Sequence, residues 1–257
     1  MQPLQLDLSG RVAVVTGATG QLGRVMTRTL ARCGADVAIH YNQNVAKAEE
    51  LCAEVRELGR RALAVTGDVG DKDAVFALRD AVQAGLGAAD IVVTNAVSQI
   101  SPWQTVLEES LEDYHDQFRT CVLQNVLMAK AFIPAMIEKG KGRYIGINTE
   151  CSMQLFKNQS AYGGAKRNMD GVLRVLAKEV GMHQITVNQV APGWTISDKD
   201  RERGTERSER YESTVPLARR GTDQEIANVV AFLASDLASF ITGAYIPVSG
   251  GNVMPTI

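Results

Sequence analysis

The stretch that decides the fold is VAVVTGATGQLG, residues 12–23. It joins an unbroken apolar run, residues 12–15, to a glycine-rich loop. Such a run is typical of a strand buried on both faces of a parallel sheet. After the loop, apolar residues recur at helical spacing until Cys33 and Gly34, which indicates a helix. The loop therefore lies where unpaired N–H groups and the positive end of a helix dipole attract a phosphate.

Each glycine of this loop has its own predicted role. Gly17 permits a tight turn, Gly20 lets the backbone approach a pyrophosphate, and Gly23 lets the helix pack closely against the strand. The alternative is a turn that merely ends the strand, because glycine-rich turns are common. The rest of the chain has to decide between the two interpretations.

Composition narrows the class of protein. The chain has 257 residues, a formal net charge of -2 and a pI of about 6.0, which gives no support for nucleic-acid binding. No apolar stretch approaches the roughly 18 residues of a membrane span, and residues 1–11 lack the features of an export signal. We therefore expect a cytoplasmic protein that binds no membrane. The four cysteines, Cys33, Cys52, Cys121 and Cys151, show no C-x-x-C spacing, which favours free thiols and no metal site.

Strands and helices alternate along the whole chain. Further strands are predicted at residues 36–41, 62–69, 90–96, 142–148, 184–190 and 244–248. Further helices are predicted at residues 45–58, 71–87, 111–138, 161–180 and 223–234. This alternation predicts one α/β domain, residues 1–257, with a doubly wound, parallel, seven-stranded sheet and helices on both faces. Its ligand crevice would lie at the carboxyl ends of the strands, where the glycine loop also lies.

A second motif supports this arrangement. Residues 162–166, YGGAK, place Tyr162 and Lys166 in a Y-x-x-x-K pattern at the start of a helix, 13 positions beyond Thr149. With these residues the chain resembles the short-chain dehydrogenase/reductase family, in its compact branch similar to 3-oxoacyl-carrier-protein reductases, over nearly its whole length. The resemblance implies a Rossmann fold. Other matching stretches are Asp68-Val69, TNA at 94–96, APG at 191–193 and ITGAYIPVSGG at 241–251.

The chemistry of this motif follows from its residue types. Tyr162 and Lys166 are four apart on a helix, so their side chains share a face. The nearby cation would lower the pKa of the tyrosine, which would then exchange a proton with the substrate as general acid or base. Thr149 would orient the substrate oxygen. The resemblance implies that Lys166 also holds the nicotinamide ribose. The alternative is an ordinary helix-start aromatic with a solvated lysine.

The cofactor preference depends on the end of the second strand. An acidic residue there would bond the ribose hydroxyls of NAD, whereas this chain has Tyr41 and Asn42. We therefore favour NADP(H). NAD(H) stays open, because no arginine stands beside Gly20 and a 2′-phosphate would have to be reached by Lys47 or Arg60.

The residues expected to bind the cofactor share the carboxyl edge of the sheet. The resemblance implies that Asp68 bonds the adenine amino group, and its alternative role is a helix N-cap. His40 is interpreted equally well as strand-end packing or as a cofactor contact. The full set is Gly17, Thr19, Gly20, Gln21, Leu22, Gly23, Tyr41, Asn42, Asp68, Val69, Asn95, Ala96, Val97, Tyr162, Lys166, Pro192, Gly193 and Thr195.

Three positions depart from the family pattern. Gln21 stands where compact members carry the middle glycine, and Val97 follows TNA where the family prefers a glycine. Cys121 occupies the place of the family's asparagine, whose role is to hold a water in a proton relay, and a thiol replaces an amide poorly. Asn125, one helical turn later, is a hypothetical substitute. Cys121 lacks the basic neighbours of a nucleophile apart from Arg119.

The substrate side is less specific. Residues 194–215 are strongly polar and correspond to the family's substrate lid, so we expect a helical flap there. Candidates to line the pocket, with core packing as their alternative, are Trp103, Met153, Phe156, Trp194 and Tyr211.

The leading interpretation is an oxidoreductase for a small carbonyl or alcohol substrate of 3-oxoacyl thioester, sugar or sterol type. A catalytically silent NADP(H)-binding sensor or assembly protein is the alternative, and a related lyase that abandoned the cofactor is disfavoured by the glycine loop and Lys166. The resemblance also implies a homotetramer through residues 111–139, 161–180 and 241–251.

Overall fold

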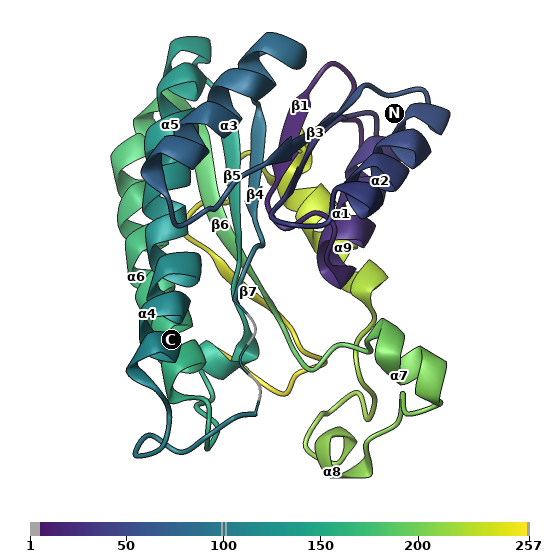
Figure 1. Ribbon diagram of the computed structural model, residues 1–257, viewed down its shortest axis with the longest axis vertical. Helices are drawn as coiled ribbons and strands as arrows, with labels where there is room; N and C mark the ends of the chain where they lie inside the picture. Colours follow the sequence, from purple (N-terminus) through teal and green to yellow (C-terminus); the bar gives the residue numbers. More distant parts are fainter. Residues whose placement is uncertain (1–5, 99, 101, 256–257) are drawn as a thin grey trace.

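Seven parallel strands form one sheet at the centre of the protein (Figure 1). The computed structural model describes residues 6–98, 100 and 102–255. Within them the strand order is β3-β2-β1-β4-β5-β6-β7, so the chain winds outward from β1 in one direction and returns to continue from β4 in the other. The strands are β1 Val12–Val15, β2 Asp36–Tyr41, β3 Ala62–Thr66, β4 Ile91–Thr94, β5 Gly142–Ile147, β6 Ile185–Pro192 and β7 Tyr245–Val248.

Helices cover both faces of the sheet, as predicted. One face carries α1 Gln21–Arg32, α2 Val45–Glu57 and α9 Asp223–Ala234. The other carries α3 Lys72–Gly85, α5 Gln124–Lys139 and α6 Ser160–Val180. The short elements are α4 Leu111–Gln117, α7 Asp198–Arg203, α8 Glu209–Glu212, η1 Phe118–Leu123, η2 Glu150–Ser152, η3 Gly181–His183 and η4 Asp236–Ala238.

The apolar strands feed two separate cores. In β1, Ala13 and Val15 pack on the side of α1 and α9, whereas Val12 and Val14 pack on the side of α3, α5 and α6. This division follows from the two-residue period of a strand. Every position of such a strand is buried, which explains the unbroken apolar run in the sequence.

Side-chain caps fix where several helices begin. Asn44 accepts a hydrogen bond from the backbone of Lys47 at the start of α2, and Asp71 caps α3 in the same way. Thr222 and Glu225 form a reciprocal capping box at the start of α9. Each cap satisfies backbone N–H groups that the first turn of a helix leaves without partners.

The predicted helix over residues 111–138 is divided into three segments. The α-helices α4 and α5 are separated by η1, a stretch of π-helix that contains Cys121. The predicted third strand also ends at Thr66 rather than at Val69. The π-helix has no signal in the apolar periodicity, because a π-bulge shifts the helix by about one residue while the apolar pattern continues. The strand ends where Gly67 and Asp68 lead into a turn.

The expectation about membrane-length segments needs a correction. Residues 111–139 are long and apolar enough to cross a membrane by length and composition. More than half of the most apolar window is nevertheless buried inside the protein. The core helix of a globular protein passes the same test, and α5 supplies Met128, Phe132 and Met136 to the core.

Candidate active site

The glycine loop is held close to two neighbouring segments. Gly17 has φ +60°, and a Cβ there would lie 2.9 Å from the Cα of Ala96. A Cβ at Gly23 would lie 2.2 Å from the carbonyl oxygen of Gly17, so α1 packs against the loop only because this residue is glycine. Gly20 is exposed and precedes the first turn of α1, where no side chain caps the N–H groups. The tight turn and the close packing predicted for Gly17 and Gly23 are therefore present.

Thr16 and Asn95 tie the loop to β4. The Asn95 Nδ2 donates to the carbonyl oxygens of Thr16 (3.0 Å) and Gly17 (3.1 Å). The Thr16 Oγ1 accepts from the backbone N–H groups of Asn95 and Ala96 and donates to Gln124 Oε1 at 2.6 Å. Thr16 and Gln124 were not among the predicted residues. A buried glutamine in the apolar sequence of α5 was the available signal.

His40 supports the same loop from β2. Its Nδ1 accepts from the backbone N–H of Gly17 at 3.1 Å, and its Nε2 lies 2.9 Å from the carbonyl oxygen of Gly67. The ring is 2 % exposed, and burial lowers the pKa of His40. Because both ring nitrogens contact backbone, the strand-end interpretation of His40 holds.

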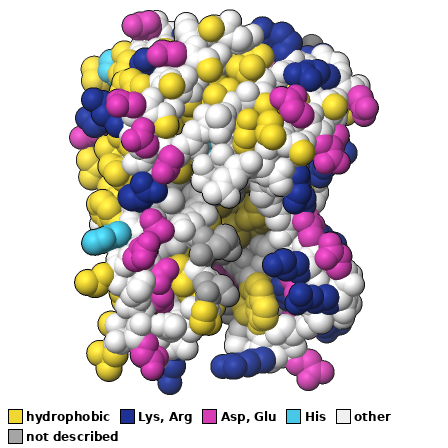
Figure 2. Space-filling view, in the orientation of Figure 1, with side chains coloured by type: hydrophobic (Ala, Val, Ile, Leu, Met, Phe, Trp, Pro, Cys, Tyr) yellow, Lys and Arg dark blue, Asp and Glu magenta, His cyan; other side chains and the backbone are white. Residues whose placement is uncertain are grey.

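Thr149, Tyr162 and Lys166 line one cleft of about 920 Å³. Thr149 follows β5, and its Oγ1 accepts from the backbone N–H of Cys151 at 3.3 Å. Lys166 on α6 is buried, donates to the carbonyl oxygen of Ile147 at 2.6 Å, and has its Nζ 5.9 Å from the Tyr162 ring centre. Figure 2 shows the surface hollowed between the body of the sheet and the segment that carries α7 and α8.

The pKa of Tyr162 differs from the sequence prediction. Burial raises the pKa of this phenol, and the nearby Cys151 and Cys121 add to the rise. The Lys166 ammonium group, which was predicted to lower this pKa, donates to the Ile147 carbonyl oxygen and lies 5.9 Å from the Tyr162 ring centre. Tyr162 is therefore held in its protonated form.

Cys121 lies inside the protein beside this site. It is 0 % exposed, its Sγ donates weakly to Gln117 Oε1 at 3.6 Å, and burial raises the pKa of the thiol. Asn125, the hypothetical substitute, is also buried and bonded to neighbouring segments. Its Nδ2 donates to the carbonyl oxygen of Cys121 at 2.7 Å, and its Oδ1 accepts from Thr94 Oγ1 at 2.7 Å. Both ends of this amide therefore support η1 and β4.

Asp68 forms an ion pair at the end of β3. Its Oδ2 accepts from Arg119 at 2.9 Å, and its Oδ1 accepts from the backbone N–H of Gly70 at 2.8 Å. Burial raises the pKa of Asp68, but the Gly70 hydrogen bond and Arg119 outweigh it, so the pKa is lowered overall. The N-cap of α3 is Asp71 rather than Asp68.

The two candidate partners of a 2′-phosphate lie at opposite edges of the sheet. Arg60 precedes β3, and its Nη1 donates to the carbonyl oxygen of Gly34, which precedes β2. Arg60 therefore belongs to the amino edge and does not meet the expectation that it could reach the cofactor. Lys47 lies in the first turn of α2, five residues after Asn42 at the carboxyl edge.

A buried arginine organises the predicted lid. Arg220 has a side chain that is 1 % exposed and donates to Asp200 Oδ2 at 2.7 Å. It also donates to the backbone carbonyl oxygens of Thr195 (3.0 Å) and Thr205 (3.1 Å), and it stacks over the Trp194 ring at 4.3 Å. Arg220 was missed because it lies outside residues 194–215 in the sequence.

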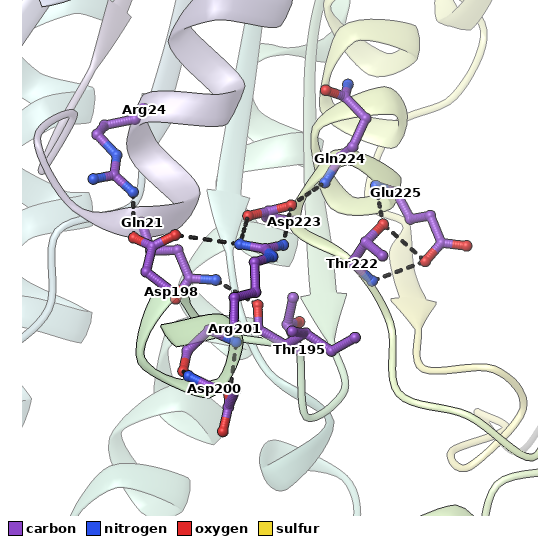
Figure 3. Close-up of polar contacts among 12 residues, drawn as sticks. Gln21, Arg24, Thr195, Asp198, Asp200, Arg201, Thr222, Asp223, Gln224 and Glu225 are labelled. Carbon is purple, nitrogen blue, oxygen red and sulfur yellow. Dashed lines mark hydrogen bonds and ion pairs between the residues drawn. The ribbon is translucent and has the colours of Figure 1, made fainter. Parts of the chain in front are cut away.

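The lid also contacts helices of the main body (Figure 3). Gln21 Nε2 donates to the carbonyl oxygen of Ile196 at 2.6 Å. Arg24 pairs with Asp198, and Arg201 forms two hydrogen bonds of 2.9 Å with Asp223. Gln21, which departs from the family's glycine pattern, therefore contacts the lid.

The cleft brings together most of the predicted residues. Those that line it are Gln21, Leu22, Asn95, Val97, Trp103, Thr149, Phe156, Tyr162, Lys166, Pro192, Gly193, Trp194, Thr195 and Tyr211. At the same edge of the sheet, Gly23 lies in the first turn of α1 and Tyr41 ends β2. The loops beside them hold Gly17, Thr19, Gly20, Asn42, Asp68, Val69 and Ala96. Met153 does not line the cleft, and its Sδ lies 2.7 Å from Arg167. A residue absent from the predictions, Glu150, does line it.

Known proteins resemble this chain in sequence over nearly its whole length. Residues 17–252 match the family model described as enoyl-(acyl carrier protein) reductase. The chain is 34% identical over 249 residues to the 3-oxoacyl-[acyl-carrier-protein] reductase of Pseudomonas aeruginosa, with 97% of this chain and 100% of that protein covered. It is 31% identical over 247 residues to the L-rhamnose 1-dehydrogenase (NAD(P)(+)) of a Sphingomonas species, with 95% and 96% covered.

A solved structure of an enzyme with a similar fold also matches this chain. The L-sorbose reductase of Gluconobacter frateurii, complexed with NADPH and L-sorbose, superposes with a TM-score of 0.88 at 26% identity, covering 98% of this chain and 100% of that chain. With the parallel sheet and the shared cleft, these matches place the chain in the short-chain dehydrogenase/reductase family. It is an NAD(P)-dependent oxidoreductase with a single Rossmann-type domain.

Proposed function

We propose that this enzyme transfers a hydride between NADP(H) and a CH–OH/C=O substrate, with Thr149, Tyr162 and Lys166 as the reacting site. The observation that carries the proposal is their convergence on one cleft beside the glycine loop. Bound nicotinamide would supply or accept the hydride. The protein would supply position, a proton and a polar environment for the substrate oxygen.

The proton step is assigned to Tyr162. Its raised pKa keeps the phenol protonated at neutral pH, and this form donates a proton to a carbonyl oxygen as it gains charge. The Thr149 hydroxyl would donate a second hydrogen bond to the same oxygen. The Lys166 ammonium, fixed by the Ile147 carbonyl, would stabilise the negative charge that develops on Tyr162.

The residues of the loop suit a dinucleotide. Gly20 is exposed at the uncapped start of α1, so N–H groups face the position of a pyrophosphate. The preference for NADP(H) is supported by the absence of an acid at Tyr41 and Asn42 and by Lys47 at the same edge. Phosphate recognition at this edge would therefore depend on Lys47.

Titration calorimetry with NADPH and NADH tests the cofactor proposal. We expect the protein to bind NADPH more tightly than NADH, and Asn42→Asp to shift the ratio of the two Kd values toward NADH by at least about tenfold. Asn228→Asp makes the same change of charge on the exposed side of α9 and should leave the ratio as it is. Binding of neither nucleotide would overturn the proposed function.

The proposal includes a lid, a location and an assembly. Residues 194–215 would open and close over the cleft to admit substrate, and the four unpaired cysteines support the cytoplasm as location. A homotetramer through residues 111–139, 161–180 and 241–251 is supported by the exposed apolar side chains of Leu111, Phe118 and Val175 within these ranges. Light scattering during gel filtration would reveal a monomer if this part is wrong.

A further inference from the structure

A buried carboxylate lies directly beside the proposed reacting residues. Glu150 follows Thr149 in the chain and begins η2. The residue is only 3 % exposed, yet it lines the cleft. A carboxylate is expensive to bury, so its surroundings decide what it can do.

The hydrogen bonds of Glu150 leave part of its capacity unused. Its Oε1 accepts from the Tyr211 hydroxyl at 2.8 Å, and its Oε2 accepts from Asn252 Nδ2 at 3.0 Å. An ionised carboxylate has about four lone-pair sites, so about two stay open to further donors. A Cβ at Gly193 would lie 2.6 Å from the Tyr211 hydroxyl oxygen and 3.1 Å from Glu150 Oε2, so only glycine at this position fits beside the pair.

Other buried carboxylates of the described residues differ from Glu150. Asp90, Asp170, Glu212 and Asp223 each form an ion pair with a lysine or an arginine. Glu109 has an oxygen without a partner, but it does not line the cleft. Within the described residues, Glu150 combines burial, the lack of an ion pair and a place on the cleft wall.

The neighbouring wall favours a compact polar ligand with apolar C–H faces. Trp103, Phe156 and Trp194 line the same cleft and keep more than a third of their surface exposed. Flat aromatic faces pack against C–H groups, while a carboxylate accepts hydrogen bonds from hydroxyl groups. A hydrocarbon chain beside Glu150 would remove water from the carboxylate without replacing its hydrogen bonds, which disfavours that substrate.

We propose that Glu150 determines substrate specificity by accepting hydrogen bonds from hydroxyl groups next to the reacting carbon, so that the enzyme acts on polyhydroxylated carbonyl compounds and the matching polyols. This inference deepens the proposed function and rests on it. Thr149 and Tyr162 would bind the reacting oxygen, and the adjacent Glu150 would bind a hydroxyl one or two carbons away. Selection arises because an unhydroxylated substrate supplies no donor to the acceptor sites that Tyr211 and Asn252 leave open.

Two ketones with the same carbon skeleton provide the test. Erythrulose and butan-2-one are both four-carbon 2-ketones, and only the first carries hydroxyl groups. The NADPH-dependent kcat/KM is measured for both with the parent enzyme, Glu150→Gln and Glu150→Ala. We expect the parent to prefer erythrulose and both variants to reduce this preference by about 10- to 100-fold, as for the loss of a hydrogen bond to a charged group.

The ratio of the two kcat/KM values cancels any loss of folded protein, because both substrates are measured on the same preparation. Asp90→Asn is the matched control: Asp90 is also buried, but it pairs with Lys139 and lies outside both the cleft lining and the lid. It should leave the substrate ratio unchanged even if stability falls.

The outcomes separate the two proposals. A parent enzyme that reduces butan-2-one or acetoacetyl-CoA as well as erythrulose would overturn the inference about Glu150 and leave the proposed function standing. An unchanged substrate ratio in Glu150→Gln and Glu150→Ala would do the same. Failure to bind NADPH or to reduce any of the three carbonyl compounds would overturn the proposed function and this inference with it.

Discussion

The two walls of the cleft are built by different interactions. On one wall, β5, η2 and α6 hold Thr149 and Lys166 through buried hydrogen bonds to backbone atoms. On the other wall, α7 is tied to α1 by the partly exposed ion pair of Arg24 with Asp198, and the buried Arg220 is the exception to this pattern. Buried, directional contacts fix the geometry of reacting groups in advance, whereas exposed ion pairs are weak and easily exchanged with water. The difference fits the roles proposed for the two walls, a rigid site for the reaction and a lid that moves.

The largest effect on turnover is expected from removing the Tyr162 hydroxyl group. Tyr162→Phe should lower kcat by about 10²- to 10⁴-fold, the usual contribution of a general acid. Stopped-flow or steady-state absorbance of NADPH would measure the loss. Tyr114→Phe is the control, because the Tyr114 hydroxyl contacts Ser160 at 2.6 Å and the residue does not line the cleft. If Tyr162→Phe were as active as the parent, Tyr162 would not be the proton donor.

The predicted lid depends on one buried charged residue, Arg220, whose side chain is as shielded from water as those of the opposite wall. Arg220→Ala should destabilise the protein by about 3–5 kcal/mol, because Asp200 and several carbonyl oxygens lose their buried partner. Arg219→Ala removes the neighbouring exposed pair with Glu225 and should cost about 0.2–1 kcal/mol. Urea unfolding compares the two. Equal losses in the free energy of unfolding would show that the buried contacts of Arg220 contribute no more to stability than the exposed pair of Arg219.

The stability that His40 contributes by its hydrogen bond to the glycine loop should depend on pH. His40 has a lowered pKa in the folded protein, so the unfolded chain binds more protons just below pH 6.5 and stability falls as the pH falls through that value. The contribution reaches about 1.4 kcal/mol per pH unit until the folded pKa is passed. Urea unfolding at several pH values should give a smaller acid slope for His40→Gln. Identical slopes in both proteins would argue against a neutral, buried His40.

The smallest loss of stability is expected from a change at Asp198, in the partly exposed ion pairs of α7. Asp198→Asn removes half-exposed pairs with Arg24 and Arg201, so the loss of stability should stay below about 1 kcal/mol and shrink at high salt. Hydrogen exchange of residues 194–215 should nevertheless become faster. Asp80→Asn breaks a surface pair on α3 and serves as the control. A lid that exchanges at the parental rate would mean that these pairs do not restrain it.

Local patterns were sufficient for the elements of the sheet and for much of the site. Apolar runs of four to eight residues located the strands, and the glycine spacing located the loop at the start of α1. The position of Arg60 just before β3 already placed it at the amino edge, so its exclusion from the cofactor site was readable from the sequence. The π-helix η1 was not readable, because one shifted residue leaves the apolar pattern intact.

The sequence by itself determined the α/β alternation, the loop at residues 16–23 and the spacing of Thr149, Tyr162 and Lys166, since these depend on neighbours close in the chain. Only the tertiary structure decided the pKa direction of Tyr162, the burial of Arg220 and the place of Glu150 on the cleft wall. Desolvation and hydrogen bonds between distant segments determine such properties, and neither is encoded in the spacing of a few residues.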